Sequence, residues 1–200
     1  MSHILKNGLN NLFEDLEKFL KDNLINIEKS LNDYITKVYI IVDLENSLTV
    51  NLSIKYNHDS KSINEQTIND LLDILKYQFS KYCDNQKVIH MMISKLLING
   101  KEKELTNVNE TIKNLIIEVK FECLKVQIIN IIQQTILKYQ ISVKKILLAD
   151  YLRWTFGSQT DDLVYKANRS INGENINEVK MIKKKPNKKY FFERFFNFFK

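Results

Sequence analysis

Apolar residues follow a helical period and then a strand period in the first part of the chain. Leucines and isoleucines recur at steps of three and four over residues 3–33, with charged residues between them, which predicts an amphipathic helix. The apolar run in 36–43 predicts a strand. Strict alternation over 47–56 predicts a second, half-buried antiparallel strand. We expect these two strands to pair as a hairpin around the turn at 44–46.

The pattern continues through helices and strands up to residue 156. Ser62 with Glu65 three residues later matches a capping box and opens a helix over 62–82. The later expected elements are a strand at 87–98, a polar loop at 101–111, a strand at 112–123, a helix at 124–139, a strand at 143–148 and a helix at 149–156. This order predicts an α+β fold with a small antiparallel or mixed sheet of three or four strands. We expect the helices at 62–82 and 124–139 to pack on that sheet, and Trp154 to cap the core.

Composition changes at Gly157. Residues 157–187 are polar, weakly periodic and rich in Asn and Lys, which is typical of a linker with little fixed structure. We therefore divide the chain into a domain at 1–156, a polar basic linker at 157–187 and a C-terminal segment at 188–200.

The C-terminal segment is basic and holds six of the eleven phenylalanines. In a helix over 188–200, Lys189, Glu193, Asn197 and Lys200 form one polar stripe, and aromatic rings cover the rest. The charged residues from position 183 onward account for the whole net charge of +6. We predict that this tail binds an anionic membrane surface through Lys183, Lys184, Lys185, Lys188, Lys189, Tyr190, Phe191, Phe192, Arg194, Phe195, Phe196, Phe198, Phe199 and Lys200.

Simple energetics favour a membrane surface as the partner of the tail. A helix this short is marginal in water and should fold on the surface it binds. Each basic residue contributes about 1 kcal/mol near anionic lipid, and each half-buried Phe adds about half of the ~1.5–3 kcal/mol of full burial. These terms suffice for reversible peripheral binding. Docking of the tail onto the domain and nucleic-acid binding are the alternatives, although nucleic acid favours aromatic residues interleaved with basic ones on a folded face.

Cysteine usage and hydropathy indicate the compartment. Cys83 and Cys123 are too few for a disulfide scaffold, so we expect buried or half-buried free thiols in a reducing environment. Charged residues interrupt the apolar stretches near the N-terminus, and no window approaches the roughly 20 apolar residues of a spanning helix. We expect a cytoplasmic protein that is peripheral on the cytoplasmic face of the inner membrane.

The segment VIHMMISKLLINGKE, Val88–Glu102, resembles the strand and turn of the SHS2 subdomain (subdomain 1C) of the bacterial cell-division protein FtsA. His90 and Gly100 fall in register with that pattern, whereas Ile93 and Asn99 stand where the family has Pro and Asp. Further stretches are similar in the same order, at Ile35–Asp43, Ser62–Lys76 and Leu115–Tyr151. The FtsA family also ends in an amphipathic membrane-targeting helix after a flexible linker.

The resemblance implies an interaction module that contacts neighbouring subunits and other division proteins. We therefore expect a membrane-tethered adaptor in bacterial cell division. A PilM-like pilus-assembly adaptor and a basic-tailed nucleic-acid-binding protein are the alternatives. The Gly-rich phosphate loops of FtsA and its FtsZ-docking subdomain have no counterpart in this sequence, so we expect no ATP or other cofactor and no direct FtsZ docking.

Residues that could carry catalysis or bind a metal are scattered. His3, His58 and His90 lie far apart, and the spacings His-x-x-x-His and Cys-x-x-Cys do not occur. The acidic pairs Asp161-Asp162 and Asp43/Glu45 lie in predicted loops without a partner base. We expect His90 to be a structural histidine, and we expect no metal site and no enzymatic activity.

Overall fold

The computed structural model describes residues 9–44, 47–57, 65–103, 112–157 and 162–179. Helices and strands mix along the chain, so the predicted α+β class is confirmed. The elements are α1 (Leu9–Leu31), β1 (Lys37–Val42), β2 (Leu48–Asn57), α2 (Glu65–Tyr82), β3 (Gln86–Ile98), β4 (Lys101–Glu102), β5 (Asn114–Lys125), α3 (Val126–Leu137), β6 (Ser142–Leu148), α4 (Ala149–Phe156) and α5 (Leu163–Ile171).

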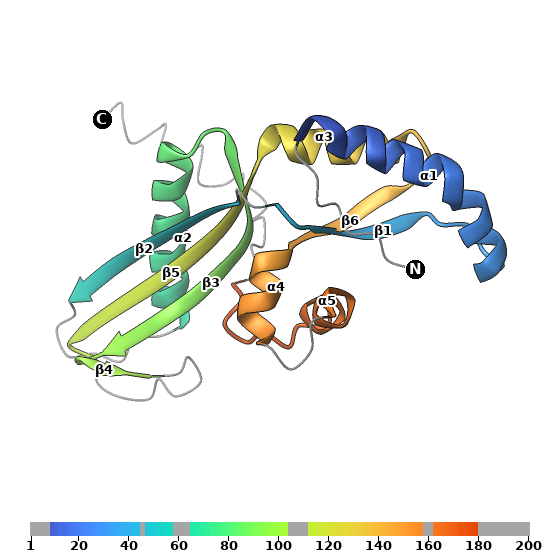
Figure 1. Ribbon diagram of the computed structural model, residues 1–200. Coiled ribbons are helices and arrows are strands. Elements are labelled where there is room, and N and C mark those ends of the chain that lie inside the picture. Colours follow the sequence, from blue (N-terminus) through green and yellow to red (C-terminus); the bar gives the residue numbers. More distant parts are fainter. Residues whose placement is uncertain (1–8, 45–46, 58–64, 104–111, 158–161, 180–200) are drawn as a thin grey trace, which may run out of the picture.

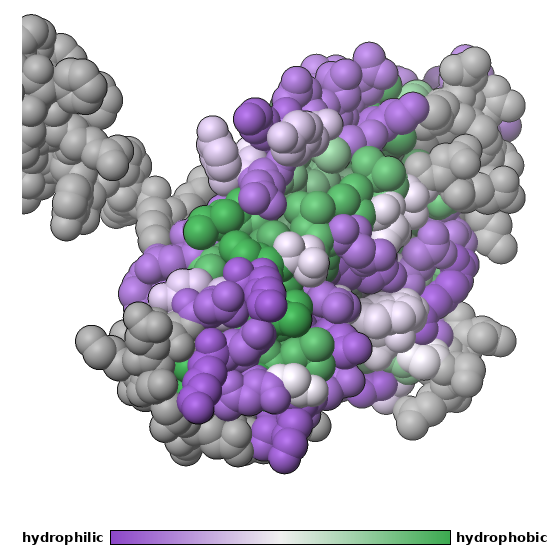
Figure 2. Space-filling view, turned by 90° about the vertical axis from the view of Figure 1, so that its left-hand side faces the viewer, coloured by the Kyte–Doolittle hydropathy of each residue, from purple (hydrophilic) through white to green (hydrophobic). Residues whose placement is uncertain are grey.

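One lobe, here called the antiparallel lobe, is a four-stranded sheet in the order β2-β5-β3-β4 with α2 across one face (Figure 1). Alternate residues of the central strand β5, such as Ile117, Val119 and Phe121, are fully buried and form one core with α2. Strand β2 has the predicted alternation, with half-buried Val50, Leu52 and Ile54 on the side of that core. From the outer end of this lobe, a band of apolar side chains lies among hydrophilic ones (Figure 2).

In the other lobe, here called the parallel lobe, the described residues form two strands, β1 and β6, which pair in parallel. Helices α1 and α3 lie on one face of this pair, and α4 and α5 lie on the other (Figure 1). The predicted hairpin is therefore wrong, because β1 pairs with β6 and β2 pairs with β5. The physical reason is visible in β1, whose residues Val38–Val42 are apolar without interruption. That pattern suits a strand covered on both faces.

Helix α3 belongs to the parallel lobe. Its buried residues Ile128, Ile129, Ile132 and Ile136 share a core with Leu147 of β6. The expectation that this helix packs on the same sheet as α2 is wrong. Periodicity reveals the buried face of a helix but not which sheet that face meets.

The stretch 157–187 is not a linker throughout. Asp162 caps α5, and its Oδ1 accepts hydrogen bonds from the backbone N–H groups of Val164 at 2.8 Å and Tyr165 at 3.3 Å. Leu163 and Ala167 are buried, so α5 is part of the core. Further on, the N–H of Val179 donates to the carbonyl of Met91 at 2.8 Å. Only four residues of this short helix are buried, and two of them, Lys166 and Ser170, are polar, so its buried face does not stand out in the sequence.

The structure also tests the expectations for Trp154 and for the two cysteines. Trp154 is 55% exposed and does not cap the core; the Nζ of Lys120 lies 4.6 Å from the centroid of its ring. Cys123 is buried and Cys83 half-buried, both as free thiols, as expected. Burial raises the pKa of Cys123 to about 12, so this thiol stays protonated at neutral pH.

Candidate protein-interaction groove

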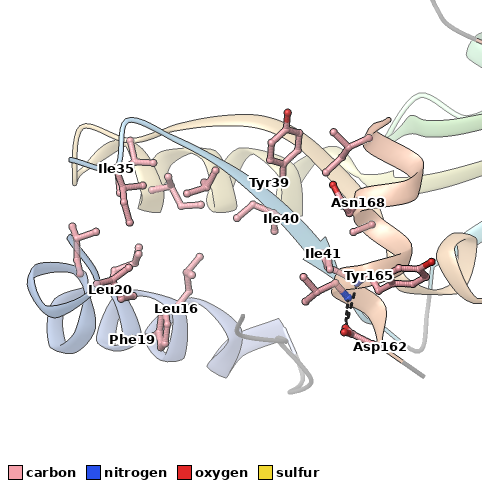
Figure 3. A pocket seen from close by; sticks show the side chains of 18 residues that line it. Leu16, Phe19, Leu20, Ile35, Tyr39, Ile40, Ile41, Asp162, Tyr165 and Asn168 are labelled. Carbon is pink, nitrogen blue, oxygen red and sulfur yellow. Dashed lines mark hydrogen bonds between the residues drawn. The ribbon is translucent and has the colours of Figure 1, made fainter. Parts of the chain in front are cut away.

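A groove of about 690 Å³ runs along the edge of β1 that does not face β6. Within the described ranges, β1 pairs with β6 alone, so its second edge carries no neighbouring strand. Helix α1 forms one wall and α5 forms the other (Figure 3). The groove therefore lies where a further strand of the sheet would lie.

The lining of the groove shows that it encloses the strand edge. The four consecutive residues Val38, Tyr39, Ile40 and Ile41 all line it. Successive side chains of a strand point to opposite faces. A cavity that both sets reach cannot lie on one face of the sheet, so it must wrap around the edge of β1.

Sequence periodicity builds both walls. On α1, Leu16, Phe19, Leu20, Leu24 and Ile27 recur at helical spacing and line the groove. Figure 3 shows Leu16 and Leu20 on the wall opposite β1. The α5 wall is shorter and follows from the cap at Asp162, which fixes the first turn of that helix.

The mouth of the groove carries exposed apolar side chains. Tyr165 is 54% exposed, Val164 is 43% exposed and Tyr39 is 39% exposed. One exposed apolar residue is ordinary, but three around one concave site mark a surface that another molecule can cover. Tyrosine is also enriched in the centres of protein–protein interfaces.

Among the described residues that line the groove, Asp162 is the one charged residue. Helical geometry places Asp15 and Asp22 on the same edge of α1 as Phe19. The two strands also carry cations: Lys37 is the exposed first residue of β1, and the Nζ of Lys144 lies 5.4 Å from the ring centroid of Tyr39. The lining itself is thus suited to a segment that is apolar with a basic end beside Asp162.

Apart from the groove, a cluster of polar side chains around His90 joins the two lobes. The Nε2 of His90 accepts a hydrogen bond from the N–H of Leu148 at 3.3 Å, so Nδ1 carries the proton of the neutral ring and donates to Glu178 Oε1 at 3.0 Å. The ring of Tyr151 stacks on the imidazole at 3.6 Å, and its hydroxyl donates to Glu178 Oε2 at 3.0 Å. Lys145 Nζ lies 3.5 Å from Glu178 Oε1.

The charges in this cluster are fixed by burial and by these contacts. Burial lowers the pKa of His90, and the hydrogen bond with Glu178 offsets this only in part. Burial would raise the pKa of Glu178, but the bond from His90 and the charge of Lys145 outweigh it and hold that pKa below its usual value. The arrangement is a neutral histidine bound to a carboxylate, and every partner comes from the fold itself. His90 therefore has the contacts of a structural histidine.

The residues predicted to bind a membrane, Lys183 to Lys200, lie outside the described residues. The groove was not predicted; the uninterrupted apolar run of β1 was a signal that both faces of this strand are covered, but not that one edge is open. Within the described part of the chain, no group of three or more His, Cys, Asp or Glu side chains could hold a metal ion. In the same residues, no helix is both long and apolar enough to cross a bilayer.

Comparisons with known proteins add little to this geometry. No family model and no curated protein matches the chain. A solved structure titled "PilM-PilN type IV pilus biogenesis complex" contains a similar chain, with a TM-score of 0.37 and 7% identity. The match covers 74% of this chain and 36% of that one, so this chain spans little more than a third of its neighbour. Likeness at this level carries no conclusion about function.

Proposed function

We propose that this protein is a non-enzymatic, membrane-tethered adaptor. Its parallel lobe binds an apolar segment of another protein in the groove along β1, and its tail at 188–200 binds an anionic membrane surface. The observation that carries the proposal is the groove, with two helical walls and an unpaired strand edge within the described residues.

The groove has the size and the support that a binding site needs. Its volume of about 690 Å³ falls in the ordinary range of ligand sites, which are apolar clefts with a few polar groups. Its walls also belong to the core of the lobe, since Leu16 and Ala167 are buried in one cluster. A site on such walls is largely preformed, which lowers the entropy lost on binding.

The tail supports the second half of the proposal by its composition. Val179 is held against β3, so the described fold closes before the tail begins. The residues that follow combine a basic run, Lys183–Lys185, with the phenylalanines of 188–200. Two signals of this kind, basic charge and apolar side chains, act together in reversible membrane anchoring.

The resemblance to FtsA makes the bacterial cell-division apparatus the first place to seek the partner. A pilus-assembly adaptor would use the same two features and is the alternative within this class. A nucleic-acid-binding protein is the alternative outside it. Binding to phosphate backbones falls steeply with salt, whereas a phenylalanine-rich face holds lipid at high salt.

Co-flotation with liposomes tests both halves. Full-length protein, Val164→Arg and the control Tyr77→Arg, which changes an exposed residue of the antiparallel lobe, are floated with anionic liposomes in an extract of the source cells. We expect all three to float, and a partner to co-float with all except Val164→Arg. Failure of the full-length chain to float contradicts the tether. An identical set of co-floating proteins with Val164→Arg contradicts the groove as the adaptor site.

A further inference from the structure

We infer that the groove binds an extended strand from a partner protein, apolar on both faces and basic at an end, which adds to β1 as a third strand of the β1–β6 sheet. This inference rests on the proposed adaptor function and specifies the chemistry of the partner.

The backbone of β1 can pair with one more strand. A strand with a neighbour on one side only presents a row of N–H and C=O groups on its other edge, and such an edge is a template for another strand. In the part of the chain that the structure describes, this edge faces the groove. Main-chain hydrogen bonds to β1 would supply affinity, and the side-chain pockets would supply specificity.

The helices on both faces of the groove determine which side chains the partner strand carries. Helix α1 covers one face of the groove and α5 covers the other. Strands covered by helices on both faces are apolar almost continuously, as β1 itself is. The partner strand is therefore apolar at successive positions. Because β1 has six residues, the apolar run should be about six residues, or about 20 Å, long.

Carboxylates near the groove determine which charged residues the partner strand carries at its end. Asp162 lies at the rim, and Asp15 and Asp22 lie along the same edge of α1. Lysine or arginine beside the apolar run would meet these carboxylates, and an acidic end would be repelled.

The space beside β1 excludes a second copy of this chain paired edge to edge. Helices α1 and α3 lie side by side over two strands. Packed helices are about 8–10 Å apart and paired strands only about 4.8 Å, so α1 must overhang the edge of β1. Two copies joined at β1 would place both α1 helices in the same space. A single strand fits beneath the overhang.

The tail of this chain lacks a continuous apolar run of the length that the groove needs. Its longest apolar run, Tyr190–Phe192, has three residues before Glu193 and Arg194 interrupt it. In the groove those charges would be buried between the two helices, which is costly without partners. The occupant is therefore a segment of another protein.

The test uses three fluorescent peptides and the full-length protein. The first peptide has six alternating valine and isoleucine residues between lysines; the second is identical but N-methylated at alternate amides; the third has glutamates in place of the lysines. We expect the first to bind, the second to bind about tenfold or more weakly because it cannot donate to β1, and the third to bind several-fold more weakly at low salt. Val164→Arg should lower the affinity at least about tenfold, and Tyr77→Arg should leave it unchanged.

Each other outcome overturns the inference. Equal binding of the N-methylated peptide means that the occupant is not a strand, and no binding of the first peptide means that the edge is not a docking site. Tenfold tighter binding by the full-length variant with Phe195→Glu and Phe199→Glu means that the tail already fills the groove. A dimer that the peptide dissociates means that a second copy fills it. Flotation of the protein alone is independent of all four results, so the tether can stand when the strand inference fails.

Discussion

The two lobes differ in the width of the sheet relative to the helices that cover it. In the antiparallel lobe, the single helix α2 covers a four-stranded sheet, and the central strand β5 has a neighbour on each side. In the parallel lobe, helices lie on both faces of a sheet that has two strands in the described residues, so the helical layers extend past the edge of β1. The comparison teaches that a sheet too narrow for its helices leaves a groove at its edge, and that binding can be built there without weakening a complete core.

The two lobes are joined by the polar cluster around His90 and Glu178. Its members come from β3, β6, α4 and the stretch after α5, so it links both sheets. If the proposed function holds, this joint separates a lobe with a complete core from the lobe that carries the proposed binding groove. The following predictions test that separation, from the largest effect on stability to the smallest.

The largest effect is expected in the core of the antiparallel lobe. Phe121 is fully buried and stacks on Phe79 with ring centroids 5.1 Å apart. The change Phe121→Ala should lower the free energy of unfolding by about 3–5 kcal/mol, because it removes a large side chain and leaves a cavity. In the same urea titration, Val164→Ala at the groove mouth should change it by less than about 0.5 kcal/mol. Similar losses for the two variants would contradict the contrast between the lobes.

A mutation in the polar cluster that joins the lobes should have an intermediate effect on the free energy of unfolding. The side chain of Glu178 is 14% exposed and accepts from His90 and Tyr151. The change Glu178→Gln should lower the free energy of unfolding by about 1.5–3 kcal/mol, because it weakens hydrogen bonds to a partly buried carboxylate. Glu174→Gln, which affects only an exposed ion pair with Arg169, serves as the control and should match the wild type. If the two variants unfold alike, the cluster does not hold the lobes together.

Acidification should reveal the neutral state of His90. Its folded pKa lies below the ordinary value of 6.5, so the unfolded chain binds protons first as the pH falls below that value. The stability therefore decreases from about pH 6.5 downward, with a slope of at most about 1.4 kcal/mol per pH unit for this one group. Glu178, whose pKa is also lowered, adds a further loss at more acidic pH.

Unfolding titrations between pH 7.5 and 5.5 check this, with His90→Gln as the comparison. The variant should lose the part of the slope that begins near pH 6.5. A stability that rises on acidification in the wild-type protein would show that His90 is protonated in the folded state.

The smallest effect on stability is expected at the tail. Removing residues 188–200 should leave the melting temperature nearly unchanged, because the proposed function assigns the phenylalanines of the tail to the membrane surface and not to the cores. It should nevertheless release the protein from anionic liposomes, and Phe195→Glu with Phe199→Glu should act almost as strongly. Replacing Lys183, Lys184 and Lys185 by Gln should weaken flotation in part, mainly at low salt, because lipid charge is screened within a Debye length. A truncated protein that still floats, or that melts far lower, contradicts the tether.

Much of the local structure followed from periodicity. The alternation of β2 and the buried face of α2 are as the sequence indicates, because local burial imposes its period on the residues. The pairing of strands did not follow, since β1 reaches β6 across about a hundred residues of chain. Helix α5 escaped prediction because only Leu163, Lys166, Ala167 and Ser170 are buried, and two of these are polar.

The groove depends on contacts that no single stretch encodes. Its two walls, α1 and α5, begin more than 150 residues apart in the sequence. The mouth residues Val164 and Tyr165 lie in a stretch whose composition is that of a linker. Only the continuous apolar character of β1 indicated that both of its faces are covered, and it did not indicate that one edge is left without a strand.

Amide hydrogen exchange of the free, full-length protein tests the central claim most directly, namely that the edge of β1 is open. Strand β5 pairs on both sides and should exchange only through global unfolding, whereas the amides of Lys37–Val42 that point away from β6 should exchange far faster. That difference should persist when the protein is diluted and in the variant with Phe195→Glu and Phe199→Glu. If the outward amides of β1 are as protected as those of β5, the edge is already covered and the account is contradicted.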